Sequence, residues 1–376
     1  MSLDSLTLFR DFSEDNRTSM EVYADNLERS LKLLARDTLN VNSYTPSIPG
    51  GLFKSRLPRG AKIRFARYFS YPNQAKKFQG TINHIVDQSY GHLLRAIDSS
   101  RTVITVHDLI PILAWKGLIP GLSYPYYPLL YKLTIASIHK AKAIIAVSQS
   151  TKRDLIAHCG LNDADITVIY NGIDPYFHVK KHEDRARARH SFGLPAQGAH
   201  IILITGNQSY KNHITSFKVM KLLQSQLIKP IHLVWLGATE FACARFLKEV
   251  MLVCEVTCLN NLSVERLVDL YNSVDCLLFP SWYEGFGWPP LEAMACGTPV
   301  VASNAASLPE IVGDAAITAA PYDVEGLAEG VKTMLEDEFK RRDYIKRGYN
   351  NVFRFTWENC ATDVFKVYQC ITLRDV

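Results

Sequence analysis

The stretch Phe279–Glu310, FPSWYEGFGWPPLEAMACGTPVVASNAASLPE, carries the strongest structural signal in the chain. An apolar run over 275–279 ends in a short loop with two glycines, 284–287, and two prolines follow. Proline suits the first helical turn and glycine the position just past the last, so we expect a helix over 291–295 that stops at Gly297. A strand, a glycine loop and a helix start are typical of the carboxyl edge of a parallel sheet. Free N–H groups and the helix dipole suit an anion there, such as a diphosphate.

Two carboxylates flank this loop. Glu284 precedes the glycines, and Glu292 lies eight residues further on, inside the expected helix. Carboxylates beside an anion site need a reason, and hydrogen bonding to sugar hydroxyls is one, because a carboxylate accepts two O–H donors well. The alternative is a structural turn with two solvated acids.

The rest of the chain alternates between strand-like and helix-like stretches. Most strand candidates are continuous apolar runs, which indicates burial on both faces and a parallel sheet covered by helices. Twelve candidates are too many for one ordinary six-stranded sheet, and the series breaks at the turn-rich segment 171–175. We therefore predict an α/β protein of two doubly wound domains with a linker near 172–195. The expected strands are 6–9, 39–44, 82–86, 103–107, 143–147, 166–170, 201–205, 231–236, 256–259, 276–279, 300–302 and 316–318.

The amino-acid composition limits the classes of protein to which this chain can belong. The 376 residues are 47% hydrophobic and 21% charged, which excludes a disordered or collagen-like chain. No apolar run reaches the roughly 18 residues of a membrane span, and residues 1–10 do not resemble a signal peptide, so we expect a cytoplasmic protein. The eight cysteines form no zinc-ligand set, and we interpret them as small buried residues.

The net charge of +5 is concentrated in the first half of the chain. The segment 54–77 holds eight basic residues, no acidic one and several aromatic ones. Basic segments with aromatics favour membrane interfaces, so we expect peripheral contact with an anionic membrane through 54–77. A solvated basic helix is the alternative, whereas the overall charge is too low for a nucleic-acid partner.

Several motifs together resemble the family-4 retaining glycosyltransferases. Besides the block at 284–303, the segments 143–155, 168–174 and 206–212 (GNQSYKN) are similar to the family's last N-domain strand and helix, its linker and its phosphate loop. The resemblance implies the GT-B fold, in which two Rossmann-like doubly wound parallel-sheet domains face a cleft. It also implies an acceptor-binding domain over 1–172, joined by a C-terminal helix at about 356–376 that crosses back, and a nucleotide-sugar-binding domain over 173–355.

The resemblance implies roles residue by residue. His107, Glu284 and Lys211 would be catalytic; Lys211 would neutralise the donor diphosphate, Glu284 would hold hydroxyls of the transferred sugar and Glu292 would hold the ribose. The implied donor site is Gly206, Asn207, Lys211, Glu284, Gly285, Phe286, Gly287, Trp288 and Glu292. On the acceptor side, we expect Tyr44, His84, Asp87, His92 and Asp108 on loops of the first domain. Without the resemblance, Lys211 would be interpreted as a surface lysine and His107 as a hydrogen-bonded structural histidine.

The chain departs from the family pattern in three places. Asn207 and Gln208 stand where the family often has an arginine beside the lysine, which would leave the diphosphate one cation short. The family's N-terminal Gly-Gly loop is replaced by residues 15–20, in which Arg17 could reach a phosphate or sit on the surface. Trp288 stands where a smaller apolar residue is common.

The implied activity is retaining transfer of a hexose, of the mannose, glucose or GlcNAc type, from a GDP- or UDP-linked donor. The implied acceptor is a hydroxyl of a glycan or polyprenyl-linked molecule in cell-surface polysaccharide or lipopolysaccharide biosynthesis. We expect neither a cofactor nor a metal, since no Asp-x-Asp motif is present. The alternative is a catalytically silent nucleotide-sugar-binding partner or scaffold. A dinucleotide oxidoreductase is disfavoured because no Gly-x-Gly-x-x-Gly follows the first strand.

Overall fold

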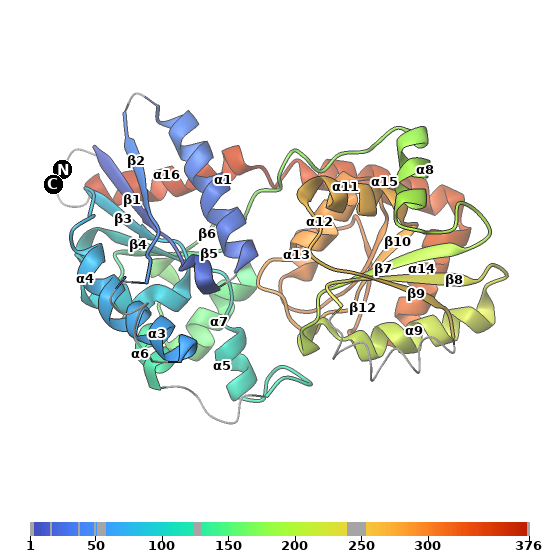
Figure 1. The fold of residues 1–376 in the computed structure, drawn as a ribbon, viewed down its shortest axis with the longest axis horizontal. Coiled ribbons are helices and arrows are strands. Elements are labelled where there is room, and N and C mark those ends of the chain that lie inside the picture. The colour runs from blue at the N-terminus through green and yellow to red at the C-terminus, as the bar shows by residue number, and fades with distance from the viewer. Residues whose placement is uncertain are drawn as a thin grey trace. The chain divides into compact units, whose positions relative to one another are not determined.

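The computed structural model describes residues 4–15, 17–36, 38–48, 50, 58–123, 129–238 and 253–373. These residues form two compact units, each with its own six-stranded parallel sheet (Figure 1). The first unit holds the described residues up to Trp115, those from 129 to Gly172 and those from Thr356 onward. The second unit holds Lys116–Ser123 and the described residues between Ile173 and Phe355.

The first sheet has the strand order β2-β1-β3-β4-β5-β6, and every neighbouring pair is parallel. The order changes direction between β1 and β3, where Phe9 is in register with Ile85. Such a reversal makes the carboxyl ends of these two strands the usual place for a ligand. The strands are β1 (Ser5–Phe9), β2 (Asn40–Tyr44), β3 (Ile82–Ile85), β4 (Thr102–Val106), β5 (Ala143–Ala146) and β6 (Ile166–Val168).

The helices of the first unit follow the sequence signals for helix ends. The side chain of Ser148 accepts a hydrogen bond from the Thr151 N–H at 3.0 Å, and Gly160 ends the same helix with φ of +69°. Both ends were predicted from the serine and glycine positions, and both are confirmed. The α-helices are α1 (Thr18–Leu34), α3 (Arg59–Phe65), α4 (Tyr71–Ala75), α5 (Ile110–Trp115), α6 (Leu129–Ser137), α7 (Gln149–Cys159) and α16 (Trp357–Leu373), and a 3₁₀ helix covers Gln88–Arg95.

The last helix, α16, packs against α1 and so completes the first unit (Figure 1). The Tyr368 hydroxyl lies 2.6 Å from Nδ1 of His84 in β3, and the Trp357 ring meets the edge of Tyr23 in α1 at 5.9 Å. Gly172, the last residue of the first unit before the second begins, lies so close to Trp357 that a Cβ there would stand 2.4 Å from its backbone nitrogen. The C-terminal helix thus returns to the first domain, as the GT-B resemblance implied.

The second sheet has the order β12-β11-β10-β7-β8-β9 and is also parallel throughout. Its direction changes between β7 and β10. The strands are β7 (His200–Thr205), β8 (Ile231–Leu236), β9 (Glu255–Leu259), β10 (Cys276–Phe279), β11 (Val300–Ser303) and β12 (Ile317–Ala319). The helices are α8 (His182–Ser191), α9 (His213–Gln226), α11 (Val264–Ser273), α12 (Trp288–Ala295), α13 (Leu308–Val312), α14 (Val324–Glu336) and α15 (Glu338–Val352).

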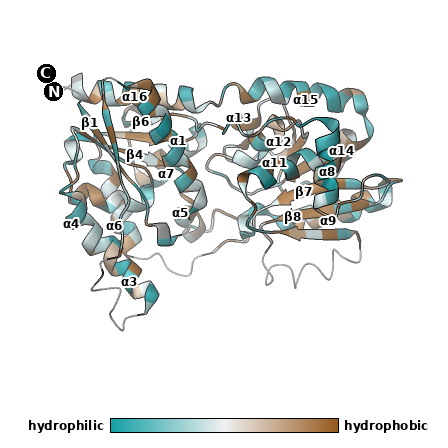
Figure 2. Ribbon diagram, turned by 45° about the horizontal axis from the view of Figure 1, so that its top comes forward, coloured by the Kyte–Doolittle hydropathy of each residue, from teal (hydrophilic) through white to brown (hydrophobic). Residues whose placement is uncertain are grey.

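The core of the second unit lies between this sheet and two helices, α9 and α14. Val219 and Leu223 of α9 and Val331 and Met334 of α14 are buried with Trp235 of β8 in one apolar cluster. Figure 2 shows the same division, with brown apolar segments along the strands and teal stretches on outer helices such as α8 and α15. Burial on both faces explains why these strands are continuous apolar runs.

The predicted fold class is confirmed, since all twelve expected strands are present within one or two residues of their predicted ends. The helix after the glycine loop begins at Trp288, three residues earlier than predicted, because its prolines are accommodated within the first turn. The helix expected over 241–252 lies outside the described residues. The prediction for the cysteines was wrong for Cys258 and Cys370, which are exposed, whereas Cys276, Cys296 and Cys360 are buried. Within the described ranges, no helix combines the length and apolarity that crossing a bilayer requires.

The contact between Gly172 and Trp357 gives a test of how α16 is docked. Replacing Gly172 by alanine should lower the free energy of unfolding by roughly 1–3 kcal/mol, because the new methyl group meets backbone and indole atoms that cannot both move away. Chemical denaturation measures the difference. Gly60→Ala in α3, where the nearest atom would be 3.9 Å away, is the matched control and should not be destabilised; equal stability of both variants would contradict this packing.

Candidate active site

The sequence-predicted donor residues gather where the second sheet changes direction. Lys211 ends a 3₁₀ turn, Ser209–Lys211, that follows β7, and Glu284 lies in the loop that follows β10. Because β7 and β10 are neighbours and parallel, both loops leave the same edge of the sheet. In open α/β sheets this is the position at which ligands bind.

Lys211 and Glu284 form an ion pair at this edge. The Nζ atom of Lys211 lies 2.8 Å from Oε1 of Glu284, and the two side chains are only 12% and 10% exposed. The ammonium group also lies 4.8 Å from the ring centre of Phe279. Gly206 has φ of +84°, and a Cβ there would stand 2.9 Å from Cγ of Lys211. The glycine therefore lets the lysine side chain fold back over the loop toward Glu284.

Asn212 fixes this lysine loop against two others. It adopts a left-handed conformation with φ of 59°, directly before α9. Its side-chain amide donates to the carbonyls of Pro280, at 3.0 Å, and Pro321, at 2.6 Å, which follow β10 and β12. The Trp282 N–H adds a bond of 2.8 Å to the Tyr210 carbonyl. These three hydrogen bonds hold the loop that carries Lys211 in place.

The glycine loop leads into α12 in the manner the sequence predicted. Gly287 has φ of +110° and precedes the helix, and the Ser307 hydroxyl lies 2.7 Å from the Phe286 carbonyl. Of the four backbone positions at a helix start that lack an intrahelical acceptor, two are here Pro289 and Pro290, which carry no N–H. The N–H groups at this mouth are therefore those of Gly287 and Trp288.

Glu292 lies in α12, and its environment raises the pKa of its carboxyl group. Its Oε2 accepts a hydrogen bond of 2.7 Å from the Tyr271 hydroxyl. Burial raises the pKa of Glu292 to about 7, against the opposing effects of the Tyr271 hydrogen bond and the positive charge of Lys211. A second group of hydroxyl donors, such as those of a ribose, would favour the ionised form.

The remaining predicted donor residues are placed around this pair. Gly206 and Asn207 lie on the lysine loop, and Gly285, Phe286, Gly287 and Trp288 connect Glu284 to Glu292. The backbone N–H of the exposed Asn207 points to Oε1 of Gln208 at 3.3 Å. Arg266 does not replace the missing arginine, since it binds Ser191 and covers the Phe192 ring at 3.9 Å, and Arg245 lies outside the described residues.

His107 lies directly after β4 at the carboxyl edge of the first sheet. It is buried, its Nε2 lies 2.8 Å from the Val86 carbonyl, and its ring meets Tyr23 at 4.7 Å. Burial lowers the pKa of His107, although the charge of Asp87 opposes this. A carbonyl partner fixes the hydrogen on Nε2 of the neutral ring, which leaves Nδ1 as the basic nitrogen.

Asp87 belongs to a charged cluster that the sequence reasoning did not assemble. Its carboxylate caps the 3₁₀ helix through the Ser89 N–H at 2.6 Å and pairs with Arg17 at 2.6 Å. Burial alone would raise the pKa of Asp87, but Arg17 and a hydrogen bond with Asp11 hold it well below its usual value. Arg17 is therefore an inward-facing ion-pair partner and not a simple surface residue.

Asp11 is the site residue that sequence reasoning missed. Its carboxyl is buried, and burial and the neighbouring Asp87 raise its pKa well above the usual value. The negative charge of Asp87 therefore disfavours ionisation of Asp11. A signal was present in the sequence, because Asp11 follows β1 just as Asp87 follows β3 and His107 follows β4.

The other acceptor candidates are held by structural contacts. The expectation that His84 lies on a loop was wrong: it lies inside β3, fully buried, with its Nε2 2.8 Å from the Thr105 hydroxyl, and burial lowers its pKa to about 3. His92 lies in the 3₁₀ helix and is bonded to the Arg67 carbonyl at 2.9 Å. Tyr44 was also expected on a loop but is the last residue of β2, and its hydroxyl donates to Gln74 at 2.6 Å. Asp108 accepts from the Ile110 N–H at 2.9 Å. Asp87 and His107 are thus the two acceptor-side predictions that the fold brings together.

In the described part of the chain, no three His, Cys, Asp or Glu side chains are grouped so that they could hold a metal ion. The positive charge at the carboxyl edge of the second sheet is that of Lys211, and at the carboxyl edge of the first sheet Arg17 is paired with Asp87.

Comparison with known proteins places these features in a family. The profile of Glycosyl transferases group 1 matches residues 184–351, and that of Glycosyltransferase Family 4 matches residues 21–177. The O-antigen chain mannosyltransferase B of Escherichia coli is 44% identical over 107 residues, which is 28% of each chain. The serotype-specific mannosyltransferase WbdA of Escherichia coli is 27% identical over 271 residues, which cover 69% of this chain and 32% of the relative. The matches thus span about a third or less of these relatives.

The fold comparison extends over the whole chain. The sucrose-phosphate synthase of Thermosynechococcus elongatus superimposes with a TM-score of 0.76 at 18% identity, covering 99% of this chain and 100% of the other. At this identity the likeness concerns the fold alone.

The raised pKa of Glu292 predicts a pH-dependent stability. In the unfolded chain its carboxyl titrates near 4.5, and in the folded protein near 7, so the folded state binds more protons between these values. The contribution of Glu292 to stability is therefore fully present below pH 4.5 and is lost as the pH rises to 7. Denaturation at several pH values should show that Glu292→Gln flattens this decline.

Glu329→Gln removes an exposed carboxylate from α14 and is the matched control. If the stability of Glu292→Gln falls in parallel with that of the wild type between pH 4.5 and 7, the pKa of Glu292 is not raised.

Proposed function

Because the chain belongs to the family-4 glycosyltransferases of the GT-B fold, we propose that it transfers a hexose from a nucleotide diphosphate sugar to a hydroxyl group. The buried ion pair of Lys211 and Glu284, beside the glycine loop where β7 and β10 meet, is the observation that carries this proposal. A buried cation paired with a carboxylate at a ligand-binding edge can change its partner when a diphosphate arrives. Glu284 is then released to accept hydrogen bonds from the transferred sugar.

The donor lies along the edge of the second sheet in this scheme. Lys211 and the N–H groups of Gly287 and Trp288 hold the diphosphate, and Glu292 holds the ribose hydroxyls. These groups are placed before the reaction begins, so they stabilise the leaving charge without reorganising. With a lysine and backbone donors supplying this stabilisation, transfer proceeds without a metal ion or a cofactor.

The reaction retains the configuration of the sugar and takes place on one face. The bond between the anomeric carbon and the diphosphate oxygen breaks, and the acceptor oxygen bonds to the same carbon from the same side. The acceptor proton passes to the departing phosphate oxygen, so the leaving group itself is the base. Lys211 holds the resulting nucleoside diphosphate, and the protein contributes positioning and electrostatics.

The transferred sugar is mannose, and the acceptor is a growing cell-surface polysaccharide. The support is the names of the two Escherichia coli relatives, both mannosyltransferases and one of them named for the O-antigen chain. The acceptor binds at the edge of the first sheet, where His107 and the neighbouring carboxyls of Asp11 and Asp87 offer donors and acceptors to sugar hydroxyls. Screening GDP-mannose against UDP-linked sugars by thermal shift identifies the nucleotide.

Removing the lysine charge tests the donor site. Lys211→Ala should reduce transfer by roughly 10²–10³-fold while the protein stays folded, because the leaving diphosphate loses its cation. Transfer of radiolabelled mannose is measured in the presence of EDTA, so that the wild-type value also tests metal independence. Lys218→Ala, an exposed lysine on α9, is the control and should be fully active.

Undiminished transfer by Lys211→Ala would overturn the donor assignment. If the wild-type protein binds the nucleotide sugar but neither transfers nor hydrolyses it, the alternative of a catalytically silent binding protein holds instead.

The basic segment supplies the contact with the membrane that carries the acceptor. In its described part, α3 carries Arg59, Lys62 and Arg64, and Phe65 and Phe69 are 49% and 60% exposed with their rings 5.2 Å apart. Arg67 points inward instead and bonds Asp15 and the Ser89 carbonyl. Exposed aromatics next to cations suit the interface of an anionic bilayer.

Flotation with vesicles that contain anionic lipid tests this contact. The wild-type protein should float with the vesicles, and Lys62→Gln/Arg64→Gln should lose most of the binding, since each cation near an anionic surface contributes about 1 kcal/mol. Lys340→Gln/Arg342→Gln on α15 removes two exposed cations of the second unit and should still float. No flotation of the wild type would end the proposal of membrane contact.

A further inference from the structure

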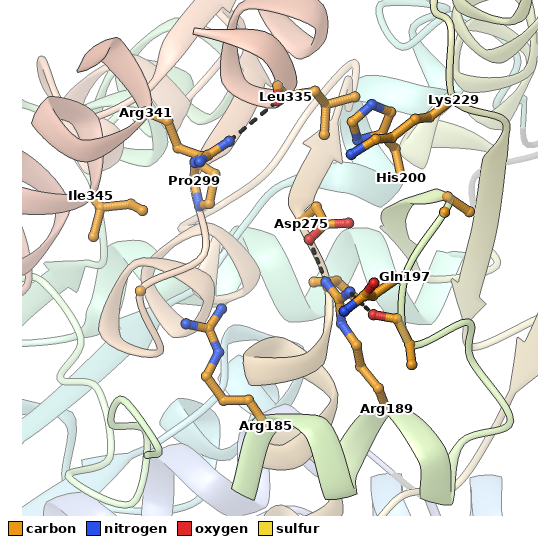
Figure 3. A pocket seen from close by; sticks show the side chains of 15 residues that line it. Arg185, Arg189, Gln197, His200, Lys229, Asp275, Pro299, Leu335, Arg341 and Ile345 are labelled. Atoms are coloured by element: carbon orange, nitrogen blue, oxygen red, sulfur yellow. Dashed lines mark hydrogen bonds and ion pairs between the residues drawn. The ribbon is translucent and has the colours of Figure 1, made fainter. Parts of the chain in front are cut away.

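A cavity of about 630 Å³ lies at the amino-terminal edge of the second sheet (Figure 3). Its walls include His200, which begins β7, Asp275, which precedes β10, and Pro299, which precedes β11. Lys211 follows the opposite, carboxyl end of β7. Six residues of β-strand separate the two edges by about 20 Å. The cavity is therefore distinct from the candidate active site.

Cations dominate the side chains that line this cavity. Arg185 and Arg189 lie one turn apart on the same face of α8, and Arg341 comes from α15. Lys229 precedes β8 and lines the same space, while Asp275 is the only carboxylate among the described residues of the wall.

The carboxylate of Asp275 already has partners within the protein. It forms an ion pair with Arg189 and accepts a hydrogen bond of 2.8 Å from the backbone N–H of Ile201. Figure 3 shows the dashed contact between Asp275 and Arg189 in the wall. The pair is neutral, so it compensates none of the other positive charges.

The three remaining cations have no acidic partner among the described residues. Arg185 uses its Nε to bond the Asn272 carbonyl at 2.9 Å, and Arg341 uses Nη1 to bond the Leu335 carbonyl at 3.2 Å. These bonds hold the two guanidinium groups in place while neutralising neither. In Figure 3 the Arg185 guanidinium points into the space below Pro299.

The charges around the cavity also act on His200 in its wall. Burial lowers its pKa, Asp275 and Glu336 act in the opposite direction, and Lys229 and Arg341 lower it further. Cations from two separate elements thus act on one group in the cavity wall, and Asp275 and Glu336 oppose them. Since Asp275 is paired with Arg189, the three other lining cations outnumber the lining carboxylates, and a bound anion would relieve their mutual repulsion.

We propose that this cavity binds a small phosphorylated molecule that carries at least two negative charges. Two guanidinium groups fixed by carbonyls offer paired N–H donors that match phosphate oxygens, and Lys229 adds a mobile positive charge. The volume lies within the range of small-molecule sites. A concave space of this size encloses a free metabolite, whereas a lipid surface would require a flat or convex patch.

The cavity is connected to the donor loop by one short helix. Gly297, which lines the cavity, follows the end of α12, and the start of α12 is formed by Gly287 and Trp288. Eight helical residues span about 12 Å, so an anion in the cavity lies against the far end of the donor-loop helix. The proposal concerns a second site, and its binding test is independent of sugar transfer.

Binding of inorganic pyrophosphate to the full chain tests the proposal by titration calorimetry. Pyrophosphate can also bind at the donor loop, so all measurements use Lys211→Ala as the background. This background protein should still bind pyrophosphate, and adding Arg185→Gln/Arg341→Gln should weaken the binding at least tenfold. The matched control Arg187→Gln/Arg342→Gln removes two exposed arginines from the same two helices, outside the cavity wall, and should leave the affinity unchanged.

Arg185 and Arg341 each bond a helix-end carbonyl, so Lys229→Gln serves as a second variant that removes an exposed cation with no such bond. It should weaken pyrophosphate binding severalfold in a protein whose thermal unfolding is unchanged. The proposal is overturned if Lys211→Ala abolishes pyrophosphate binding, or if the cavity and control variants lose the same affinity. Loss of sugar transfer in any variant leaves this result unaffected, because no sugar donor is present.

Discussion

Two parallel sheets whose strand order reverses determine where this protein can place its charges. Between β7 and β10 the reversal brings the loops of Lys211 and Glu284 together, and between β1 and β3 it brings Asp11 next to Asp87. In both places the buried charge is balanced by a neighbour, because an isolated ion would be too costly to bury. The loops at both reversal points therefore carry paired and not isolated buried charges.

Much of the fold was predictable because parallel strands buried on both faces are continuous apolar runs. The glycine loop before α12 lies at the carboxyl edge of the second sheet, as its place between a strand and a helix predicted, and Lys211 and Glu284 meet there. The acceptor edge was less predictable, because Arg17 and Asp87 are 70 residues apart and meet only through the sheet order. His84 was placed on a loop although it falls within the predicted strand 82–86, and its two ring nitrogens lie within hydrogen-bond distance of the Tyr368 and Thr105 hydroxyls inside the core.

The two edges of the second sheet differ in how their charges are compensated. At the carboxyl edge, Lys211 is paired with Glu284, and burial raises the pKa of Glu292 against the effect of the Tyr271 hydroxyl. At the amino edge, Arg189 is paired with Asp275, Arg185 and Arg341 are held by backbone carbonyls, and Lys229 is exposed. A carbonyl orients a guanidinium without cancelling its charge. At one edge of the sheet the charge of Lys211 is compensated by Glu284, whereas the side chains at the other edge carry a net positive charge.

The hydrogen bond between His84 and Tyr368 joins residues 284 positions apart and has a consequence for synthesis. Domains usually fold as they leave the ribosome, beginning at the N-terminus. Here the first sheet lacks the helix that covers His84 and Tyr23 until residues 357–373 have been translated. The second domain, contiguous apart from one short loop, can fold first. The N-terminal half of the nascent chain therefore lacks part of its apolar cover until this helix has been made.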